Sequence, residues 1–205
     1  MRVGKMGFAL DLASIEGLDK DEALRRLGYV DTGRRTDRIG RDVAWAATSK
    51  GRVVLIARHG WLKPARLAEL SGGASLVAGR FETHVGDSNA WGYRDGACVW
   101  SVLCSEEGRH GDQHGLTVDG APPPEFAVIR ERLLAERRAE AHDDDEPDEG
   151  LLDLPEELVG AIGGWTPEGD NSEDLQFFIA APDGVAAQRS PGFFSRLFKG
   201  LGRSR

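Results

Sequence analysis

Two segments of the chain carry residue types that could perform chemistry or make specific contacts. The first is His110-Gly111-Asp112-Gln113-His114, where two imidazoles and one carboxylate lie within five consecutive residues. Imidazole and carboxylate groups are ligands for divalent transition metals. The candidate metal ligands are therefore His110, Asp112 and His114, and a metal-dependent enzyme of the hydrolase type is one hypothesis for this protein.

The surrounding sequence favours a simpler interpretation of that run, as a polar loop. It lies in a glycine-containing stretch, and no further pair of His or Cys stands at the spacing that would complete a metal site. His59 and Glu82 belong to no recognisable acid–base or nucleophile motif. No phosphate-binding loop, dinucleotide fingerprint or serine elbow occurs either. The sequence therefore predicts no cofactor and assigns no catalytic residue.

The second segment is the C-terminal stretch, which we expect to form a short amphipathic helix. Wound at about 100° per residue, its apolar side chains fall within an arc of roughly 140° and its basic side chains lie opposite. Such a helix is typical of a peptide that lies on an anionic membrane surface or fills a groove on a partner protein. A third interpretation is that it folds back on its own domain. The candidate contact residues are Phe193, Phe194, Arg196, Leu197, Phe198, Lys199, Leu201 and Arg203.

The charge of the chain is divided unevenly between this segment and the rest. The formal net charge is −8, but residues 189–205 carry five basic side chains and no acidic one, which leaves −13 on residues 1–188. An acidic body disfavours binding to nucleic acid, whose phosphates need Lys and Arg. The same charge suits an inhibitor or immunity-type protein that covers a basic partner, which is a further hypothesis.

The remainder of the chain is predicted to form an α+β fold, a mostly antiparallel sheet with helices packed on one face. Alternating apolar residues and turn signals favour strands, and apolar residues three and four apart favour helices. The run Val53 to Ile56 is apolar throughout, so its strand is expected to be central and covered on both faces. We expect a loop over 31–41. Asp19 is the expected N-cap of the first helix, with Glu22 completing a capping box, and Asp95-Gly96 is the expected tight hairpin turn. The expected strands are 7–15, 43–48, 52–58, 74–85, 90–94, 97–104, 116–118 and 175–180, and the expected helices begin near 19 and span 64–70, 125–140 and 155–162.

The predicted organisation along the chain has four parts. Residues 1–140 form the α+β domain, and residues 141–150 are an acidic linker. Residues 151–181 supply a helix and a further strand that pack on the domain. Residues 182–205 form a tether and the flexible, basic, amphipathic tail. No apolar run approaches the roughly 18 residues that a membrane-spanning helix needs.

Part of the chain resembles a family of uncharacterised bacterial proteins. The resemblance extends from Trp91 to Leu158, and its motifs are a turn, core aromatics and a proline corner, so it implies a shared fold and a bacterial origin but no activity. The residues that carry it are Trp91, Asp95-Gly96, Val99-Trp100-Ser101-Val102, Leu116, Val118, Gly120, Pro122-Pro123, Phe126 and Leu154-Pro155-Glu156-Glu157-Leu158.

These observations predict a non-enzymatic bacterial protein of the cytoplasm whose tail docks it on a membrane surface or a partner protein. Peripheral attachment at the inner membrane face is the location that the membrane version implies. The metal-dependent enzyme and the acidic inhibitor remain the alternatives.

Overall fold

The described part of the chain forms a nine-stranded antiparallel sheet accompanied by five helices. The computed structural model describes residues 9–37, 42–82, 85–105, 115–140, 151–167 and 174–186. The strands are β1 (Ala9–Glu16), β2 (Tyr29–Thr36), β3 (Val43–Ala47), β4 (Val53–Arg58), β5 (Ser75–Glu82), β6 (Asp87–Arg94), β7 (Ala97–Ser105), β8 (Leu116–Gly120) and β9 (Phe177–Pro182). The helices are α1 (Lys20–Arg26), α2 (Pro64–Leu70), α3 (Pro124–Glu140), α4 (Asp153–Gly163) and α5 (Asp183–Ala186).

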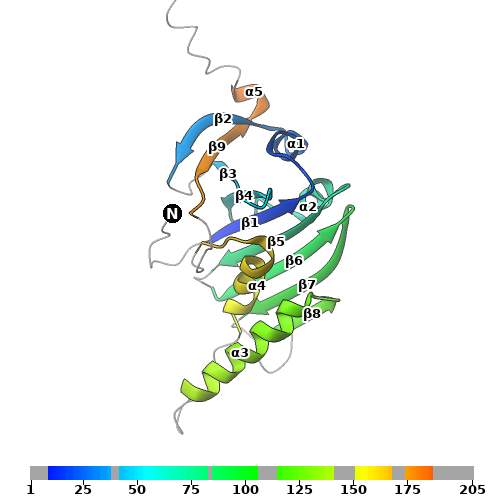
Figure 1. The fold of residues 1–205 in the computed structure, drawn as a ribbon, viewed down its shortest axis with the longest axis vertical. Coiled ribbons are helices and arrows are strands. Elements are labelled where there is room, and N and C mark those ends of the chain that lie inside the picture. The colour runs from blue at the N-terminus through cyan, green and yellow to red at the C-terminus, as the bar shows by residue number, and fades with distance from the viewer. Residues whose placement is uncertain are drawn as a thin grey trace, which may run out of the picture.

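The order of strands across the sheet is β2-β9-β3-β4-β1-β5-β6-β7-β8 (Figure 1). From β5 to β8 the strands follow one another as hairpins, which are local in the sequence. The other half contains a long-range insertion, because β9 lies between β2 and β3. The last described strand, β9, therefore joins β2 to β3 and completes this half of the sheet.

Helices cover both faces of this sheet, so the expectation that they pack on one face is wrong. Residues of β1 alternate between the two faces: Leu10 and Leu12 join a core with α4, whereas Ala13 and Ile15 join a core with α1 and α2. The continuous apolar run of β4 explains the arrangement, because a strand apolar at every position must be buried on both sides. That strand was expected to be covered twice, and the structure confirms it.

The face under α4 (hereafter the α4 face) is closed by direct contact between backbone and side chains. An added Cβ at Gly92 would lie 2.0 Å from the Trp100 indole nitrogen, so only glycine leaves room for that ring. At Gly163 an added Cβ would lie 2.9 Å from Cβ of Ser14, and the Ser14 hydroxyl donates to the Gly163 carbonyl over 2.8 Å. The Gly163 contact holds α4 directly against β1, and the Gly92 contact lets the Trp100 ring pack over β6.

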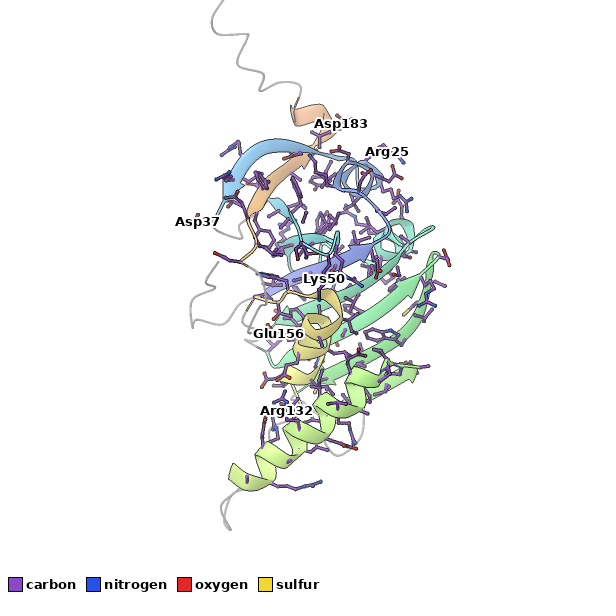
Figure 2. The ribbon with its side chains drawn as sticks, viewed as in Figure 1. Arg25, Asp37, Lys50, Arg132, Glu156 and Asp183 are labelled. Carbon is purple, nitrogen blue, oxygen red and sulfur yellow. The ribbon has the colours of Figure 1, made fainter. Side chains whose placement is uncertain are left out.

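The longest helix, α3, has only a narrow buried side. Leu133 is buried, while Phe126 and Ile129 pack partly against the core beneath α4. Arg132 pairs with Glu136 on its own helix and with Glu157 on α4, near the opposite end of the molecule from Asp183 (Figure 2). Among the helices that the structure describes, none is both long and apolar enough to cross a bilayer.

Several local predictions are confirmed and one is wrong. Asp95 and Gly96 form the predicted tight turn, with φ angles of +50° and +84°, and α2 begins at Pro64 as expected. The predicted loop over 31–41 is wrong in its first half, because residues up to Thr36 belong to β2. This strand has a register shift between Asp31 and Arg35, and its pairing partner is β9, far along the chain.

Candidate functional site

The residues singled out by sequence lie outside the described part of the structure. His110, Asp112 and His114 fall in the undescribed stretch 106–114. All tail candidates fall within 187–205, namely Phe193, Phe194, Arg196, Leu197, Phe198, Lys199, Leu201 and Arg203. The structure therefore leaves both hypotheses as predictions. Within the described ranges, no three His, Cys, Asp or Glu side chains gather as metal ligands would.

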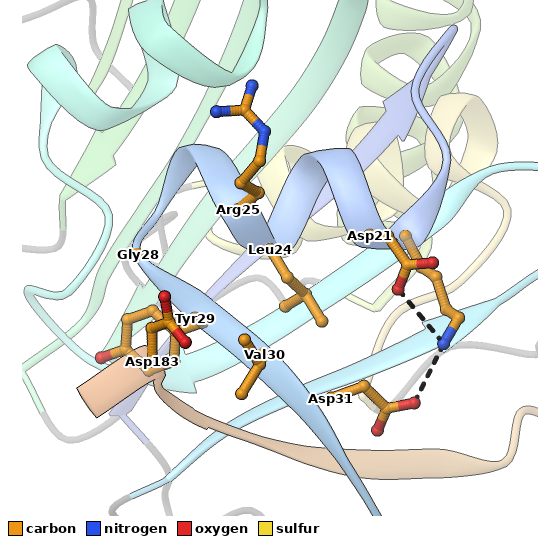
Figure 3. A pocket seen from close by; sticks show the side chains of 9 residues that line it. Asp21, Leu24, Arg25, Gly28, Tyr29, Val30, Asp31 and Asp183 are labelled. Carbon is orange, nitrogen blue, oxygen red and sulfur yellow. Dashed lines mark hydrogen bonds and ion pairs between the residues drawn. The ribbon is translucent and has the colours of Figure 1, made fainter. Parts of the chain in front are cut away.

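A hollow of about 380 Å³ opens at the end of the molecule where α1, β2 and α5 meet (Figure 3). Its volume is at the lower end of the range of small-ligand pockets. Two short elements form its walls, since α1 has seven residues and α5 has four. The lining residues are Lys20, Asp21, Leu24, Arg25, Gly28, Tyr29, Val30, Asp31 and Asp183.

One end of the hollow holds a lysine between two carboxylates. Lys20 Nζ lies 3.0 Å from Asp31 Oδ2 and 3.4 Å from Asp21 Oδ1. The hydrogen bond to Asp31 raises the pKa of Lys20, although partial burial opposes the effect. The ammonium also lies 4.9 Å from the centre of the Trp45 ring, close enough for a cation–π contact. Lys20 is therefore a cation whose charge its neighbours already balance.

Asp31 is the fixed carboxylate of this end. Burial acts to raise its pKa, but hydrogen bonding by the Gly33 backbone N–H and by Lys20, together with the nearby Trp45 indole, gives a net lowering. The Gly33 N–H donates to Asp31 Oδ1 over 2.8 Å, at the irregular part of β2 where Gly33 has a φ of +67°. These bonds favour the ionised form of Asp31, which contributes negative charge to the hollow.

The other end of the hollow presents the carboxylate of Asp183. The backbone N–H of Asp183 donates to the Gly28 carbonyl over 3.0 Å, which fixes the start of α5 against the turn after α1. The Asp183 side chain is exposed, and no side chain of the described residues pairs with it. It lies beside Tyr29 (Figure 3), whose hydroxyl accepts a hydrogen bond from the Trp61 indole N–H over 3.4 Å.

The sequence positions this hollow through the start and the end of α1. Asp19 caps the helix by accepting from the Glu22 N–H over 2.8 Å, as predicted. The Glu22 side chain does not complete a capping box; it binds Arg25 and Arg26 instead. The bond from Arg25, followed by that from Arg26, lowers the pKa of Glu22 to about 2.

The bonds of Arg26 join α1 to its neighbour. Its Nη1 donates to three carbonyls around the end of α2, those of Glu69, Leu70 and Gly72, at 3.2, 3.3 and 2.6 Å. Basic side chains at a helix C-terminus satisfy carbonyls that have no partner within the helix. The Glu22–Arg26 pair therefore fixes α1, and with it one wall of the hollow, against α2.

A second charged group, the carboxylate of Asp11, lies in the core on the face that α1 and α2 cover, and it is bound by neighbouring groups of the domain. The fully buried carboxylate of Asp11 accepts from Arg80 Nε at 2.9 Å, from Arg80 Nη2 at 3.3 Å and from the Leu62 N–H at 2.6 Å. Arg80 Nη2 also donates to the Leu62 carbonyl. Both oxygens of the Asp11 carboxylate accept hydrogen bonds from the protein itself, so this carboxylate is not available to bind a ligand. Its bond to the Leu62 N–H attaches the segment before α2 to the sheet.

The structure also brings together two residues that the sequence could not pair. His59 Nε2 lies 3.2 Å from Glu82 Oε2, at the ends of β4 and β5, and each side chain is about a third exposed. Such a pair is an ordinary partly exposed ion pair when His59 is protonated, and contributes little to stability. Sequence spacing alone does not show it, because β1 lies between the two strands.

Comparison with known proteins assigns the chain to no class. No protein-family model matches it, and no curated protein or solved structure matches it either. The resemblance of residues 91–158 to uncharacterised bacterial proteins therefore stays a prediction.

Proposed function

We propose that this chain is a non-enzymatic bacterial protein of the cytoplasm, and that its C-terminal segment docks it reversibly on an anionic membrane surface. The observation that carries the proposal is the pattern of residues 193–203, in which five apolar side chains share one helical face and Arg196, Lys199 and Arg203 lie opposite. Peripheral attachment at the inner membrane face follows from this chemistry.

The length of the segment limits what it can do. About 12 helical residues at 1.5 Å each span roughly 18 Å, which is too short to cross a bilayer. An interfacial helix instead buries its apolar face at the boundary of headgroups and acyl chains, while its cations meet anionic headgroups. Gly192, Gly200 and Gly202 lower its intrinsic helicity, so the helix is expected to form on contact. Attachment through one such helix is weak and reversible.

Co-sedimentation with liposomes tests the proposal. Full-length protein is expected to pellet with vesicles rich in anionic lipid, and a chain ending at Gln188 is expected to remain in the supernatant. Equal sedimentation of the two chains would reject the membrane version.

Two point variants separate the apolar and basic contributions. Leu197→Glu places a charge in the apolar face, and Arg196→Glu reverses one cation, so each should reduce sedimentation on anionic vesicles several-fold. The matched control is Arg138→Glu on α3, which makes the same change of charge at an exposed residue of the domain. If the control lowers binding as much as Arg196→Glu, net charge alone explains attachment and the segment has no special role.

The partner version of docking predicts a different outcome. A synthetic peptide of residues 189–205 would then retain a defined protein from a bacterial extract, with Phe194, Leu197, Phe198 and Leu201 as the anchors in a groove. A peptide of the same composition in scrambled order is the control. Recovery of the same proteins by both peptides would count against this version.

A further inference from the structure

We propose that the hollow between α1, β2 and α5 is an intramolecular docking site for the basic side chains of residues 189–205. In this arrangement the domain holds its own C-terminal segment until an anionic surface competes for the same cations. The competing surface rests on the proposed function above, whereas the docking itself does not.

The charges around the hollow favour a cation as its occupant. Three carboxylates line it, those of Asp21, Asp31 and Asp183, against two cations. Both cations are already engaged, since Lys20 pairs with Asp31 and Asp21, and Arg25 is bound by Glu22. Arg25 also extends away from Asp183 (Figure 3). Asp183 is left without a side-chain partner among the described residues, so an incoming Lys or Arg meets an uncompensated carboxylate.

The shape of the hollow suits the aliphatic stem of a basic side chain. Leu24 and Val30 lie between its two polar ends (Figure 3). Lys and Arg carry three or four methylene groups below the charged head, and these groups pack readily on apolar side chains. A basic side chain can therefore lie along Leu24 and Val30 with its head at either carboxylate end.

The position of the hollow identifies the occupant. Asp183 begins α5, and the chain continues from Ala186 directly into residues 187–205, which carry five basic side chains and no acidic one. Arg189 is only six residues beyond Asp183, a reach of up to about 20 Å for an extended chain. A tether of this length gives its cations a millimolar effective concentration at the hollow. No separate partner holds that advantage.

The proposed contact would act as a switch of low energy. Anionic headgroups and the hollow compete for the same cations of the segment. A vesicle surface carries many negative charges and the hollow carries few, so the segment leaves the hollow for the vesicle. A second consequence is sensitivity to salt, because exposed ion pairs are screened once the Debye length falls to a few ångströms, near 1 M salt.

Limited proteolysis of the full-length protein tests the docking without any membrane. Trypsin cleaves after Lys and Arg, so the initial rates of cleavage after Arg189, Arg196 and Lys199, read by mass spectrometry, report how accessible the segment is. The test variant is Asp21→Asn/Asp183→Asn. The matched control is Glu125→Gln/Glu131→Gln, which removes two exposed carboxylates on α3. Thermal unfolding verifies that all three proteins are folded, and a free peptide of residues 189–205 gives the unprotected rate.

The proposal predicts that wild type and control are cleaved about three- to tenfold more slowly than the test variant. The protection is expected to disappear near 1 M salt relative to the free peptide. Equal rates in wild type and test variant, or equal acceleration by the control pair, would overturn the docking.

The same proteins on anionic vesicles separate this inference from the proposed function. The test variant should bind vesicles a few-fold more tightly than wild type, because its segment is no longer held. Protection from trypsin without any vesicle binding would sustain the docking and refute the membrane proposal. Vesicle binding together with equal trypsin rates would support the membrane proposal and refute the docking.

Discussion

The two faces of the sheet both bury apolar cores, but they differ in the further contacts that hold their helices. On the α4 face, glycines allow close contacts: Gly163 of α4 lies against Ser14 of β1, and Gly92 of β6 leaves room for the Trp100 ring of β7. On the opposite face, the two seven-residue helices α1 and α2 bury apolar side chains against the strands, and polar bonds join them to their surroundings as well. The Asp11–Arg80 pair and the three carbonyl contacts of Arg26 are the main examples.

This difference indicates where a binding site can arise. The helices α1 and α2 are too short to cover a nine-stranded sheet from end to end. The hollow at α1, β2 and α5 lies at the end that they leave uncovered. The charged groups around it are half-buried or exposed, so they can exchange partners at low cost. The α4 face is apolar and closely packed, and its contribution is stability.

The largest effect is expected from crowding the α4 face. Gly92→Ala places a Cβ about where the Trp100 ring stands, so the ring must move and the free energy of unfolding should fall by about 3 kcal/mol. The matched control is Gly72→Ala, where an added Cβ has no contact closer than 3.5 Å. Urea unfolding measures both. A loss below about 1 kcal/mol for Gly92→Ala would show that this face is less closely packed than described.

The opposite face should be most sensitive at its buried carboxylate. Asp11→Asn keeps the shape but removes the charge that balances Arg80, and we expect a loss of about 2 kcal/mol, because water still reaches part of the guanidinium. Asp119→Asn, at an exposed position of β8, is the control. The same unfolding assay applies, and equal effects of the two variants would contradict a stabilising role for the pair.

Acid should act on this polar face through Glu22. Its pKa in the folded protein is about 2, against an ordinary value of 4.5, so the folded state favours the ionised form. The stabilisation is complete above pH 4.5 and is lost as the pH falls from 4.5 towards 2. Glu22→Gln should remove that part of the pH dependence, measured as urea midpoints between pH 2 and pH 6. Glu131→Gln is the control, and an unchanged pH profile for Glu22→Gln would contradict the assignment.

The smallest effect is expected from removing metal. If residues 110–114 form a polar loop, the purified protein contains well under one metal ion per chain, and a chelator leaves its thermal midpoint unchanged. Elemental analysis and a melting curve measure the two quantities. A stoichiometric transition metal whose removal lowers stability would revive the enzyme hypothesis for His110, Asp112 and His114.

The features that sequence predicted here are those set by neighbouring residues. The Asp95-Gly96 turn needs positive φ angles that glycine and aspartate tolerate, and the α2 start at Pro64 and the Asp19 cap need only local geometry. The burial of β4 on both faces also followed from its own four apolar residues.

The features that sequence missed depend on pairing between distant segments. Residues 31–36 carry the polar, glycine-containing composition of a loop, and they are a strand because β9 pairs with them. The hollow was missed for the same reason, since Asp183 reaches Gly28 only through that pairing. One signal was available in advance: Lys20 and Asp21 lie at the expected start of a helix, and Asp31 follows shortly after its end. Charged residues at such a place are usually solvent-exposed, so the signal is weak.

The central claim is that the cations and apolar side chains after residue 189 attach this protein to anionic surfaces. The most direct measurement is the partition coefficient of the full-length protein on vesicles as the fraction of anionic lipid increases. Attachment through these cations predicts a steep rise for wild type and a nearly flat response for Arg196→Ser/Lys199→Ser/Arg203→Ser. A wild-type partition that does not depend on anionic lipid, or a triple variant that follows the wild-type curve, would contradict it.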